Sequence, residues 1–428
     1  MPDSERCDVM FHLGGEHMQP NLILARLLRA PRNVVVVSPQ TREAGGRLAL
    51  AARRGRGGFP AEVECAEIDQ PHDPVAAAEC VRRLIAREAG RRIVVNITGG
   101  TKPMAFAALS NAQGAGLPCA YLDVEERRLH LLDGSGWHSR DISAEPPPLD
   151  IDDFVDLSGY SFESGGCGSW AESGKPDREA RAETTARLWK NRTLLQREQG
   201  EMVKIAEKQK GVGSVGGVDK RFFAEKAKDG ARRLLLNGRE EAGAGEWPDF
   251  WNYLAGTWLE EYAYLKLRPL VGEGGLTDLR IDVGLRAKDR PGRLENANAK
   301  PTLNQLDLVF TDGWRLWIVE CKAGRCSQEH VQKLENLVRR VGGMHGRGCL
   351  LLVGEVDGRG SNGFAAALRR TQESRSGVFC FWVRGRQPGA KRASDIVPKV
   401  KPATGEFGKA LRQWIMDLES GWCCELET

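Results

Sequence analysis

The sequence predicts an α/β protein with two domains. Three observations support this: the chain has 428 residues, strand and helix patterns alternate through its first third, and a charged hairpin pattern follows in its second half. This length exceeds the usual size of one domain, and each half is long enough to bury a core. We assign residues 1–150 to a first domain, 151–245 to a linker and helical connector, and 246–428 to a second domain.

The first domain is predicted from strands that are almost entirely apolar. Such strands, alternating with helices, are typical of a Rossmann-like parallel sheet covered on both faces. The predicted strands are Val9–Leu13, Asn33–Ser38, Glu62–Ile68, Arg92–Asn96, Pro118–Asp123 and Leu129–Leu132. The predicted helices are Asn21–Arg29, Val75–Ala89 and Pro103–Ala112. Folds of this class bind ligands beyond the carboxyl ends of the strands, at helix N-termini.

Two glycine-rich loops fall at that edge of the predicted sheet. The segment Ile97–Pro103, ITGGTKP, offers backbone N–H groups, hydroxyls and a lysine at the start of a helix, which is a pattern suited to an anion. The segment Leu13–Asn21, LGGEHMQPN, connects the first strand to the first helix. Neither segment has the spacing of a P-loop or of the dinucleotide-binding fingerprint, and a plain tight turn is the alternative explanation of each.

The middle of the chain carries fewer signals. The segment Ser158–Asp177 is rich in glycine and serine and predicts a linker, and Arg178–Lys210 predicts charged helices. Glycines punctuate residues 211–217, and Phe222–Leu236 is interpreted as a further helix. The second domain is predicted to open with a helix over Tyr253–Leu267. Downstream of the hairpin we expect a helix and then a core strand, over Ser327–Val341 and Gly348–Gly354.

The stretch from residue 304 to residue 322, NQLDLVFTDGWRLWIVECK, predicts a β-hairpin. Its Asp-Gly pair is the signal of a two-residue turn. With Asp312 and Gly313 as that turn, Asp307 lies opposite Ile318, and Glu320 is its diagonal neighbour at about 7–8 Å. Because side chains alternate along a strand, Lys322 is expected on the same face as Glu320.

This arrangement predicts a metal-dependent hydrolase of phosphodiester bonds. Asp307 and Glu320 would share a hard cation, Mn²⁺ or Mg²⁺, which prefers oxygen ligands. Lys322 would position or deprotonate the attacking water, or neutralise charge in the transition state. The alternative is a strand end with solvated charges. The site is favoured because these charges interrupt hydrophobic strands, where an unpaired carboxylate is costly to bury.

The residues resemble a known family. D-(x)n-E-x-K across a hairpin is similar to the PD-(D/E)xK nuclease superfamily, and NITGGTKPM and PNL resemble the two ligand loops of CARF domains. Together they resemble the CARF-domain CRISPR ancillary nucleases, which are activated by cyclic oligoadenylate. The resemblance implies a CARF domain followed by a restriction-endonuclease-like α/β domain. It also implies a homodimer with cyclic tetra-adenylate as activator, in type III CRISPR antiviral defence.

The resemblance also implies which residues act. It assigns effector contact to the two loops and, as a further contact, to Ser38: Gly14, Gly15, Gln19, Asn21, Ser38, Thr98, Gly99, Gly100, Thr101 and Lys102. A helix before the hairpin contributes a further acidic residue in this family, and Glu260 matches it, although spacing does not separate it from Glu261. The implied catalytic residues are Glu260, Asp307, Glu320 and Lys322, of which the three acids bind metal. Gln305 stands where an acidic residue is common, which implies a lost or weakened metal contact.

Composition limits the remaining possibilities. Residues 323–401 carry 15 lysines and arginines against 6 acidic residues, an excess that suits a phosphate backbone, although such residues more often coat a solvated surface. The 11 cysteines lack the spacing of a zinc site and are expected to be reduced. The sequence shows no signal pattern at its start and no apolar run of about 18 residues, so we expect a cytoplasmic protein without a membrane partner.

Three functions follow. The first is a nuclease that cyclic tetra-adenylate activates and that cleaves DNA, RNA or both. The second is an autonomous restriction or repair endonuclease whose first domain binds another nucleotide. The third is a nucleotide sensor or regulator without catalysis, for which Gln305 is the only support. The sequence leaves open the preferred nucleic acid, the ring size of the activator and the choice of metal.

Overall fold

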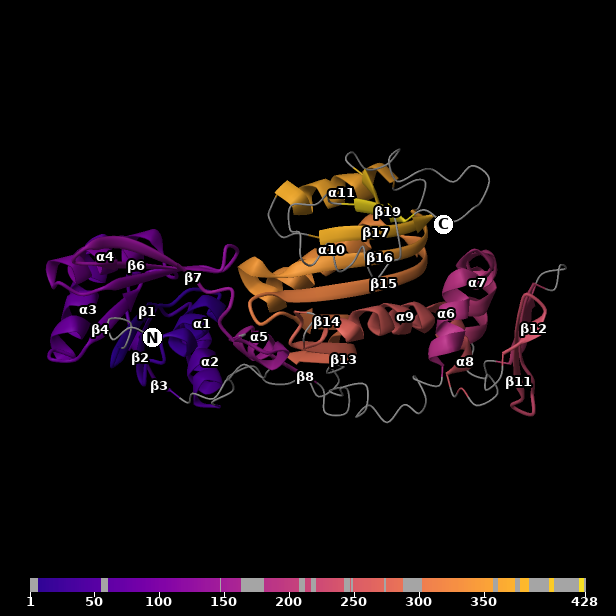
Figure 1. Ribbon diagram of the computed structural model, residues 1–428, viewed down its shortest axis with the longest axis horizontal. Helices are drawn as coiled ribbons and strands as arrows, with labels where there is room; N and C mark the ends of the chain where they lie inside the picture. The colour runs from indigo at the N-terminus through magenta and orange to yellow at the C-terminus, as the bar shows by residue number, and fades with distance from the viewer. Residues whose placement is uncertain are drawn as a thin grey trace.

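The computed structural model describes most of the two predicted domains. The described residues are 7–54, 61–146, 148–162, 181–207, 212–216, 221–241, 247, 249–272, 275–287, 302–356, 361–373, 378–384, 400–403 and 423–426. Within them the chain forms two α/β domains and an outlying sheet at the end far from the first domain (Figure 1). No helix in this part of the chain is long and apolar enough to cross a membrane.

The first domain is a seven-stranded sheet with strand order β3-β2-β1-β4-β5-β6-β7. Strands β1 to β5 pair in parallel, and β6 and β7 add an antiparallel edge. Its strands are β1 Val9–Leu13, β2 Arg32–Val37, β3 Glu62–Glu67, β4 Ile93–Asn96, β5 Cys119–Asp123, β6 Arg128–Asp133 and β7 Gly136–Asp141. Its helices are α1 Gln19–Leu27, α2 Arg42–Arg53, α3 Pro74–Arg87 and α4 Lys102–Gly114.

This architecture confirms the Rossmann-like prediction. Every strand and helix predicted for the first domain is present, and α2 and β7 are additional. Helices α3 and α4 cover one face of the sheet, where Val9, Phe11 and Val34 are buried. Helices α1 and α2 cover the other face.

The junction between the domains is helix α5, Ile151–Leu157, which lies between them in Figure 1. Its Phe154 is 1% exposed and belongs to a core that continues from α1 into the second domain. Neighbouring acidic residues tie α5 to both sides: Asp153 pairs with Arg26 of α1 at 2.6 Å, and Asp152 pairs with Arg280 of the second domain at 3.0 Å. The helix therefore fixes how the two domains meet.

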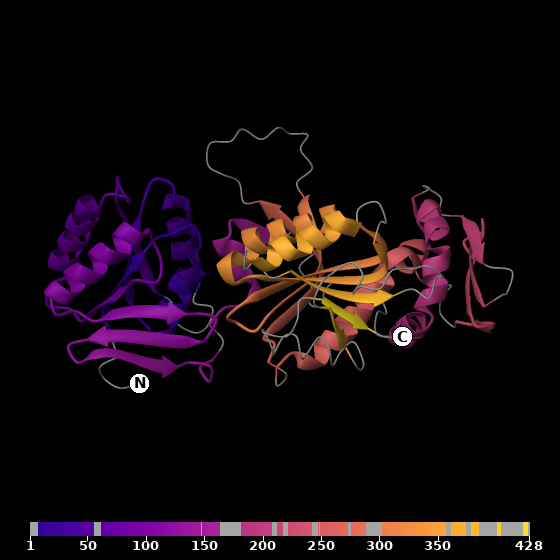
Figure 2. The same ribbon diagram turned by 90° about the horizontal axis from the view of Figure 1, so that it is seen from above.

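The second domain is an eight-stranded sheet with order β18-β19-β17-β16-β15-β14-β13-β8 (Figure 2). Its strands are β8 Tyr160–Phe162, β13 Asp278–Ala287, β14 Thr302–Thr311, β15 Leu316–Cys326, β16 Arg347–Val356, β17 Val378–Arg384, β18 Val400–Ala403 and β19 Cys423–Leu426. Its helical segments are α8 Phe250–Asn252, η3 Tyr253–Thr257, α9 Trp258–Leu267, η4 Arg268–Leu270, α10 Gln328–Leu337, η5 Val338–Gly342, η6 Gly343–His345 and α11 Ser361–Glu373. Helices α10 and α11 pack on one face and α9 packs on the other.

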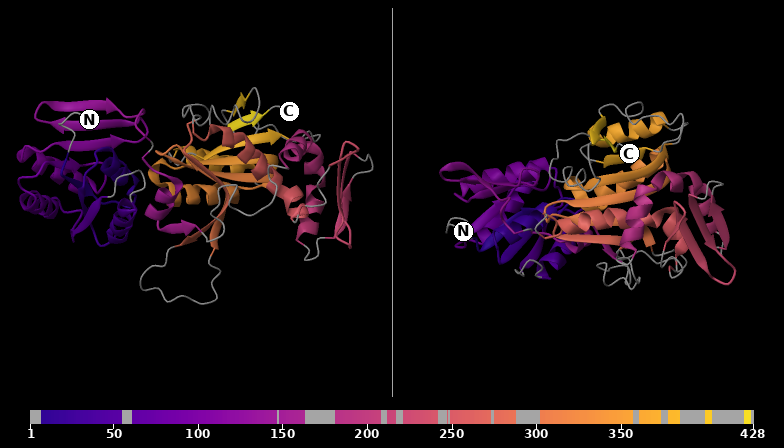
Figure 3. Two further views of the ribbon diagram at one scale, coloured as in Figure 1. Left: turned by 60° about the horizontal axis from the view of Figure 1, so that its bottom comes forward. Right: turned by 45° about the vertical axis from the view of Figure 1, so that its right-hand side comes forward.

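The connector contains two helices, α6 Ala182–Lys190 and α7 Arg192–Ala206, as the charged pattern predicts. The predicted linker over Ser158–Asp177 lies largely outside the described residues, but its first part forms β8, an edge strand of the second sheet. The connector also forms a small antiparallel sheet of β9 Gly213–Gly216, β10 Phe222–Lys226, β11 Arg232–Leu236 and β12 Arg239–Glu240 (Figure 3).

The helix predicted over Phe222–Leu236 is wrong, because this segment is the β10–β11 hairpin. Two turn dipeptides explain the difference. Gly230, in Asp229-Gly230, has φ +92°, and Asn237 and Gly238 have φ +51° and +77°, which suits a tight hairpin turn and not a helix. Burial alternates along β11, where Leu234 and Leu236 are buried and Leu235 is partly exposed, as in a half-buried strand.

Candidate functional site

The predicted hairpin is present as β14 and β15, but its loop is longer than expected. Thr311 pairs with Leu316, so four residues, 312–315, lie outside the ladder. The Asp312 carboxylate accepts the backbone N–H groups of Trp314 and Arg315, both at 2.9 Å. This side chain stabilises the wider loop in place of the two-residue turn that the Asp-Gly pair predicts.

The longer loop corrects the predicted register. Val309, and not Asp307, faces Ile318. One step beyond the last pair of the ladder, Leu308 with Val319, Asp307 falls opposite Glu320. On this register the two residues occupy directly opposed positions and not diagonal ones, and the charge of Glu320 acts on Asp307.

The Asp307 and Glu320 carboxylates lie in a half-buried setting. Asp307 Oδ2 accepts the backbone N–H of Cys321 at 2.7 Å, and Glu320 is only 3% exposed. Burial raises the pKa of Asp307 to about 7, and the neighbouring charge of Glu320 adds to the rise. Two carboxylates that oppose each other's ionisation form a suitable place for a cation.

Lysines supply the positive charge around this pair. Lys322 Nζ lies 2.8 Å from Glu320 Oε1, and Lys333 of α10 lies 4.0 Å from the same oxygen. Burial would lower the pKa of Lys322, but the charge and hydrogen bond of Glu320 outweigh burial and raise this pKa. Lys322 is therefore an ammonium ion at neutral pH. This state favours charge neutralisation over proton abstraction among the roles that the sequence suggests.

The structure gives Glu260 and Glu261 different surroundings, which the sequence alone does not distinguish. Glu261 is fully buried and pairs with the buried Arg181. Glu260 is half-buried on α9, and its charge acts on Cys321, whose side chain packs on the α9 side of the sheet. Glu320 faces α10 on the other side. Among the described residues no group of three or more His, Cys, Asp and Glu side chains is placed to hold one ion, so the predicted gathering of Glu260 with the Asp307–Glu320 pair is not found.

We expect Glu261→Gln to destabilise the protein and Glu260→Gln to leave its stability nearly unchanged. Removing the charge of Glu261 leaves Arg181 buried with a weakened partner, which costs about 3–5 kcal/mol. Glu260→Gln should change the free energy of unfolding by less than about 1 kcal/mol and lower cleavage about tenfold through its charge near the site. Urea denaturation and a cleavage assay on both variants measure these effects. Parent-like cleavage by Glu260→Gln would show that the charge of Glu260 does not act on the carboxylate pair.

Gln305 contacts an acidic residue that the sequence pattern does not single out. Its side-chain amide donates a hydrogen bond to Asp282 of β13. Asp282 has φ +58°, and Ile281 and Val283 on its two sides pack into different cores, so β13 changes face at this residue. A left-handed residue inside a strand is strained, and such strain concentrates at functional sites. An aspartate or glutamate at position 305 would repel Asp282.

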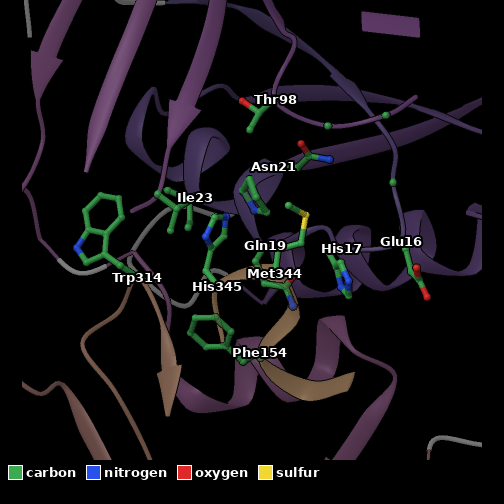
Figure 4. Close-up of a pocket in the computed structure, with 16 residues that line it drawn as sticks. Glu16, His17, Gln19, Asn21, Ile23, Thr98, Phe154, Trp314, Met344 and His345 are labelled. Atoms are coloured by element: carbon green, nitrogen blue, oxygen red, sulfur yellow. The ribbon is translucent and has the colours of Figure 1, made fainter. Parts of the chain in front are cut away.

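A cavity of about 290 Å³ lies where the loops of the first domain meet the second domain (Figure 4). Its lining combines both predicted ligand loops with residues from α5, the β14–β15 loop and the η5–η6 turn. The lining residues are Gly15, Glu16, His17, Gln19, Pro20, Asn21, Ile23, Thr98, Gly99, Gly100, Val124, Phe154, Trp314, Gly342, Met344 and His345.

The two glycine-rich loops press against each other, which explains their composition. A Cβ on Gly99 would lie 2.5 Å from the carbonyl oxygen of Leu13, and Gly100 has φ +78°. Below them the Asn96 side chain donates hydrogen bonds to Asn21 at 2.9 Å and to the ring of buried His12 at 3.0 Å. Burial lowers the pKa of His12 to about 4, so this network is neutral at pH 7. These contacts fix both loops at the carboxyl edge of the sheet.

The cavity contains six of the ten predicted effector residues: Gly15, Gln19, Asn21, Thr98, Gly99 and Gly100. Gly14, Ser38, Thr101 and Lys102 do not line it. The Thr101 hydroxyl caps α4 by accepting the N–H of Met104, and Ser38 contacts Thr41. Effector contact by these four residues remains a prediction.

The part of the lining that the sequence pattern misses comes from the second domain. Trp314, Met344 and His345 are more than 200 residues away from both predicted ligand loops along the chain, and no local motif connects them to those loops. Only folding about α5 brings them together.

Basic residues predicted to bind nucleic acid lie on the surface of the second domain. Arg339, Arg340, Arg369 and Arg370 are exposed, while Lys391 and Arg392 lie outside the described residues. Arg339 pairs with Glu335 at 3.0 Å. Eight of the described cysteines are free thiols, as expected.

The fold and site together define a class: a Rossmann-like domain with two glycine-rich loops beside a cavity, joined to an α/β domain whose hairpin carries two carboxylates and a lysine. Residues 250–358 match the family model of the Card1-like endonuclease domain. This match covers the hairpin, α9, α10 and β16. Comparison of the sequence with curated proteins gives no match.

Solved structures share the whole architecture. Can2 from Sulfobacillus thermosulfidooxidans in complex with cyclic tetra-adenylate is 18% identical with a TM-score of 0.60, over 87% of this chain and 95% of that chain. VC1899 from Vibrio cholerae is 13% identical with a TM-score of 0.63, over 87% and 93%. A type III CRISPR defence DNA nuclease activated by cyclic oligoadenylate is 19% identical with a TM-score of 0.53, over 96% of this chain and 52% of that chain. These likenesses show that the chain shares the two-domain α/β fold of these proteins.

Proposed function

We propose that this protein is a nuclease that cyclic tetra-adenylate activates in type III CRISPR antiviral defence. The observation that carries the proposal is the Asp307–Glu320 pair beside Lys322, within residues that match the Card1-like endonuclease domain. The junction cavity with both ligand loops supports the activator, as do the ligands named for the Can2 structure and for the CRISPR defence nuclease.

The carboxylate pair fits a divalent metal ion. Its donors are hard oxygens, and the pKa of Asp307 is raised first by burial and then by the charge of Glu320, so a cation would favour the ionised pair. Asp307 and Glu320 would hold the ion. A bound Mg²⁺ or Mn²⁺ would polarise the scissile phosphate and supply a more acidic water. Lys322, as an ammonium ion, stabilises negative charge on the phosphate, and the exposed arginines attract the nucleic acid backbone.

We propose that the active form is a homodimer. The cavity is at the lower end of the size range of small-molecule sites, about 300–1,000 Å³. It therefore suits one nucleotide better than a ring of four. A second copy related by a two-fold axis would contribute an equal share of the ring's contacts.

Purified protein with labelled DNA and RNA, single- and double-stranded, tests the proposal. Each substrate is incubated with Mg²⁺, Mn²⁺ or EDTA, with and without cyclic tetra-adenylate. We expect cleavage that requires metal and rises about 5- to 150-fold with the effector, the usual range of allosteric coupling. Equal cleavage with and without effector would favour the autonomous endonuclease. Effector binding without cleavage under any condition would favour the sensor.

A further inference from the structure

We infer that the nuclease half contributes an adenine-binding subsite to the effector cavity, formed by Trp314, Met344 and His345. The inference rests on the proposed function, because the base is one of those in the effector. It goes further in assigning direct contact with the effector to residues outside the CARF domain.

The apolar part of the subsite combines one exposed side chain with aromatic rings that are held by packing. Met344 is 71% exposed although it lines the cavity, so a large apolar surface is available at its mouth. Trp314 and Phe154 are 2% and 1% exposed, so they are fixed in place by packing. Aromatic rings and thioethers pack favourably against purine faces. Figure 4 shows Thr98 and Asn21 toward one side of the cavity and Phe154 and Trp314 toward the other.

The polar part of the subsite is His345. Its Nδ1 is buried and has no hydrogen-bond partner. The Glu125 carboxylate lies 3.8 Å from this nitrogen, too far for a hydrogen bond, and its oxygen instead accepts from Arg347 at 2.9 Å. Burial lowers the pKa of His345, so its ring is neutral at pH 7, and its side chain, 23% exposed, lines the cavity. An adenine edge offers both donors and acceptors for a neutral imidazole.

The subsite packs against the predicted effector loop that leads into α1. The Ser158 hydroxyl donates to the Val341 carbonyl at 2.8 Å and is 3.5 Å from the Gln19 side-chain amide. Gly343 has φ +67°, and a Cβ there would lie 3.2 Å from Gln19 Oε1. The η6 turn that carries Met344 and His345 is therefore packed directly against the first domain.

A base in this subsite contacts the hairpin that carries the carboxylate pair. Trp314 belongs to the four-residue loop between β14 and β15. The same loop is tied to the first domain by the ion pair of Arg127 with Asp312 and by the hydrogen bond from Arg315 to the Glu125 carbonyl. The effector can shift the hairpin only if it binds one arrangement of this loop more tightly than another.

Binding of cyclic tetra-adenylate to full-length Met344→Ala and His345→Ala tests the inference. We expect the Kd of each variant to rise about tenfold, in line with the loss of one base contact. Leu50→Ala is the matched control, because Leu50 is an exposed apolar residue of α2, 55% exposed, and does not line the cavity. The unfolding midpoint of each variant is measured beside its Kd.

A second readout separates base recognition from a general structural effect. The parent should prefer cyclic tetra-adenylate to its inosine counterpart, and His345→Ala should reduce that preference while Leu50→Ala keeps it. If the parent binds and responds to the effector but both cavity variants match its Kd, the subsite is overturned and the proposed function stands. If the parent itself does not bind cyclic tetra-adenylate, the subsite and the proposed function are both overturned.

Discussion

Replacement of Glu320 with glutamine is expected to reduce effector-stimulated cleavage about a thousandfold. Glu320 is 3% exposed, lies opposite Asp307 and pairs with Lys322 at 2.8 Å. Glutamine keeps the size of the side chain and removes its charge, so it weakens any cation held by the pair. Stabilisation of transition-state charge by a bound cation is worth several kcal/mol, and each about 1.4 kcal/mol is tenfold in rate.

Single-turnover cleavage of labelled DNA and RNA, with effector and metal, measures this loss. Glu329→Gln is the control, because Glu329 is an exposed glutamate in the first turn of α10. The affinity of Glu320→Gln for cyclic tetra-adenylate should stay within about twofold of the parent, since the cavity is a separate site. Equal cleavage by Glu320→Gln and the parent would remove Glu320 from the mechanism.

Asp307→Asn is expected to abolish cleavage and at the same time to stabilise the metal-free protein at pH 8. The native pKa of Asp307 is raised to about 7, above its value in an unfolded chain, because of burial and the charge of Glu320. The native state therefore binds a proton between about pH 4 and pH 7 that the unfolded state has released. The free energy of unfolding falls as pH rises through this window. Above it, the native state bears the full cost of an ionised, buried Asp307.

Asparagine removes this penalty and can still accept the N–H of Cys321. The gain in the free energy of unfolding is up to about 4 kcal/mol at pH 8 and shrinks toward pH 5. Urea denaturation in EDTA at both pH values measures it, with Asp69→Asn, an exposed aspartate, as the control. An Asp307→Asn variant that is less stable than the parent at pH 8 would contradict the geometry of the carboxylate pair.

The first domain could be predicted almost completely because its central strands are continuous apolar runs. Runs such as Asn33–Ser38 are too short for buried helices, and proline or glycine marks where several helices begin. The apolar segment Phe222–Leu236 favours a helix by composition, but the turn residues Asp229-Gly230 and Asn237-Gly238 direct it into the β10–β11 hairpin.

The candidate catalytic residues could be predicted from the alternation of side chains, but their register could not. Asp312 and Thr311 form hydrogen bonds within the loop that stabilise its longer form, and these local side-chain contacts override the preference of an Asp-Gly pair. The choice between Glu260 and Glu261 depended on Arg181, a residue 80 positions away from Glu261. The part of the cavity lining that comes from the second domain could not be predicted for the same reason, because long-range packing about α5 creates it.

Titration with cyclic tetra-adenylate, with binding and cleavage rate followed on the same preparation in Mn²⁺, tests the central claim most directly. If occupancy of the cavity drives hydrolysis at the Asp307–Glu320 pair, the cleavage rate rises with effector binding, both saturate together, and Glu320→Gln binds without cleaving. A cleavage rate that stays constant while the effector binds would contradict the claim.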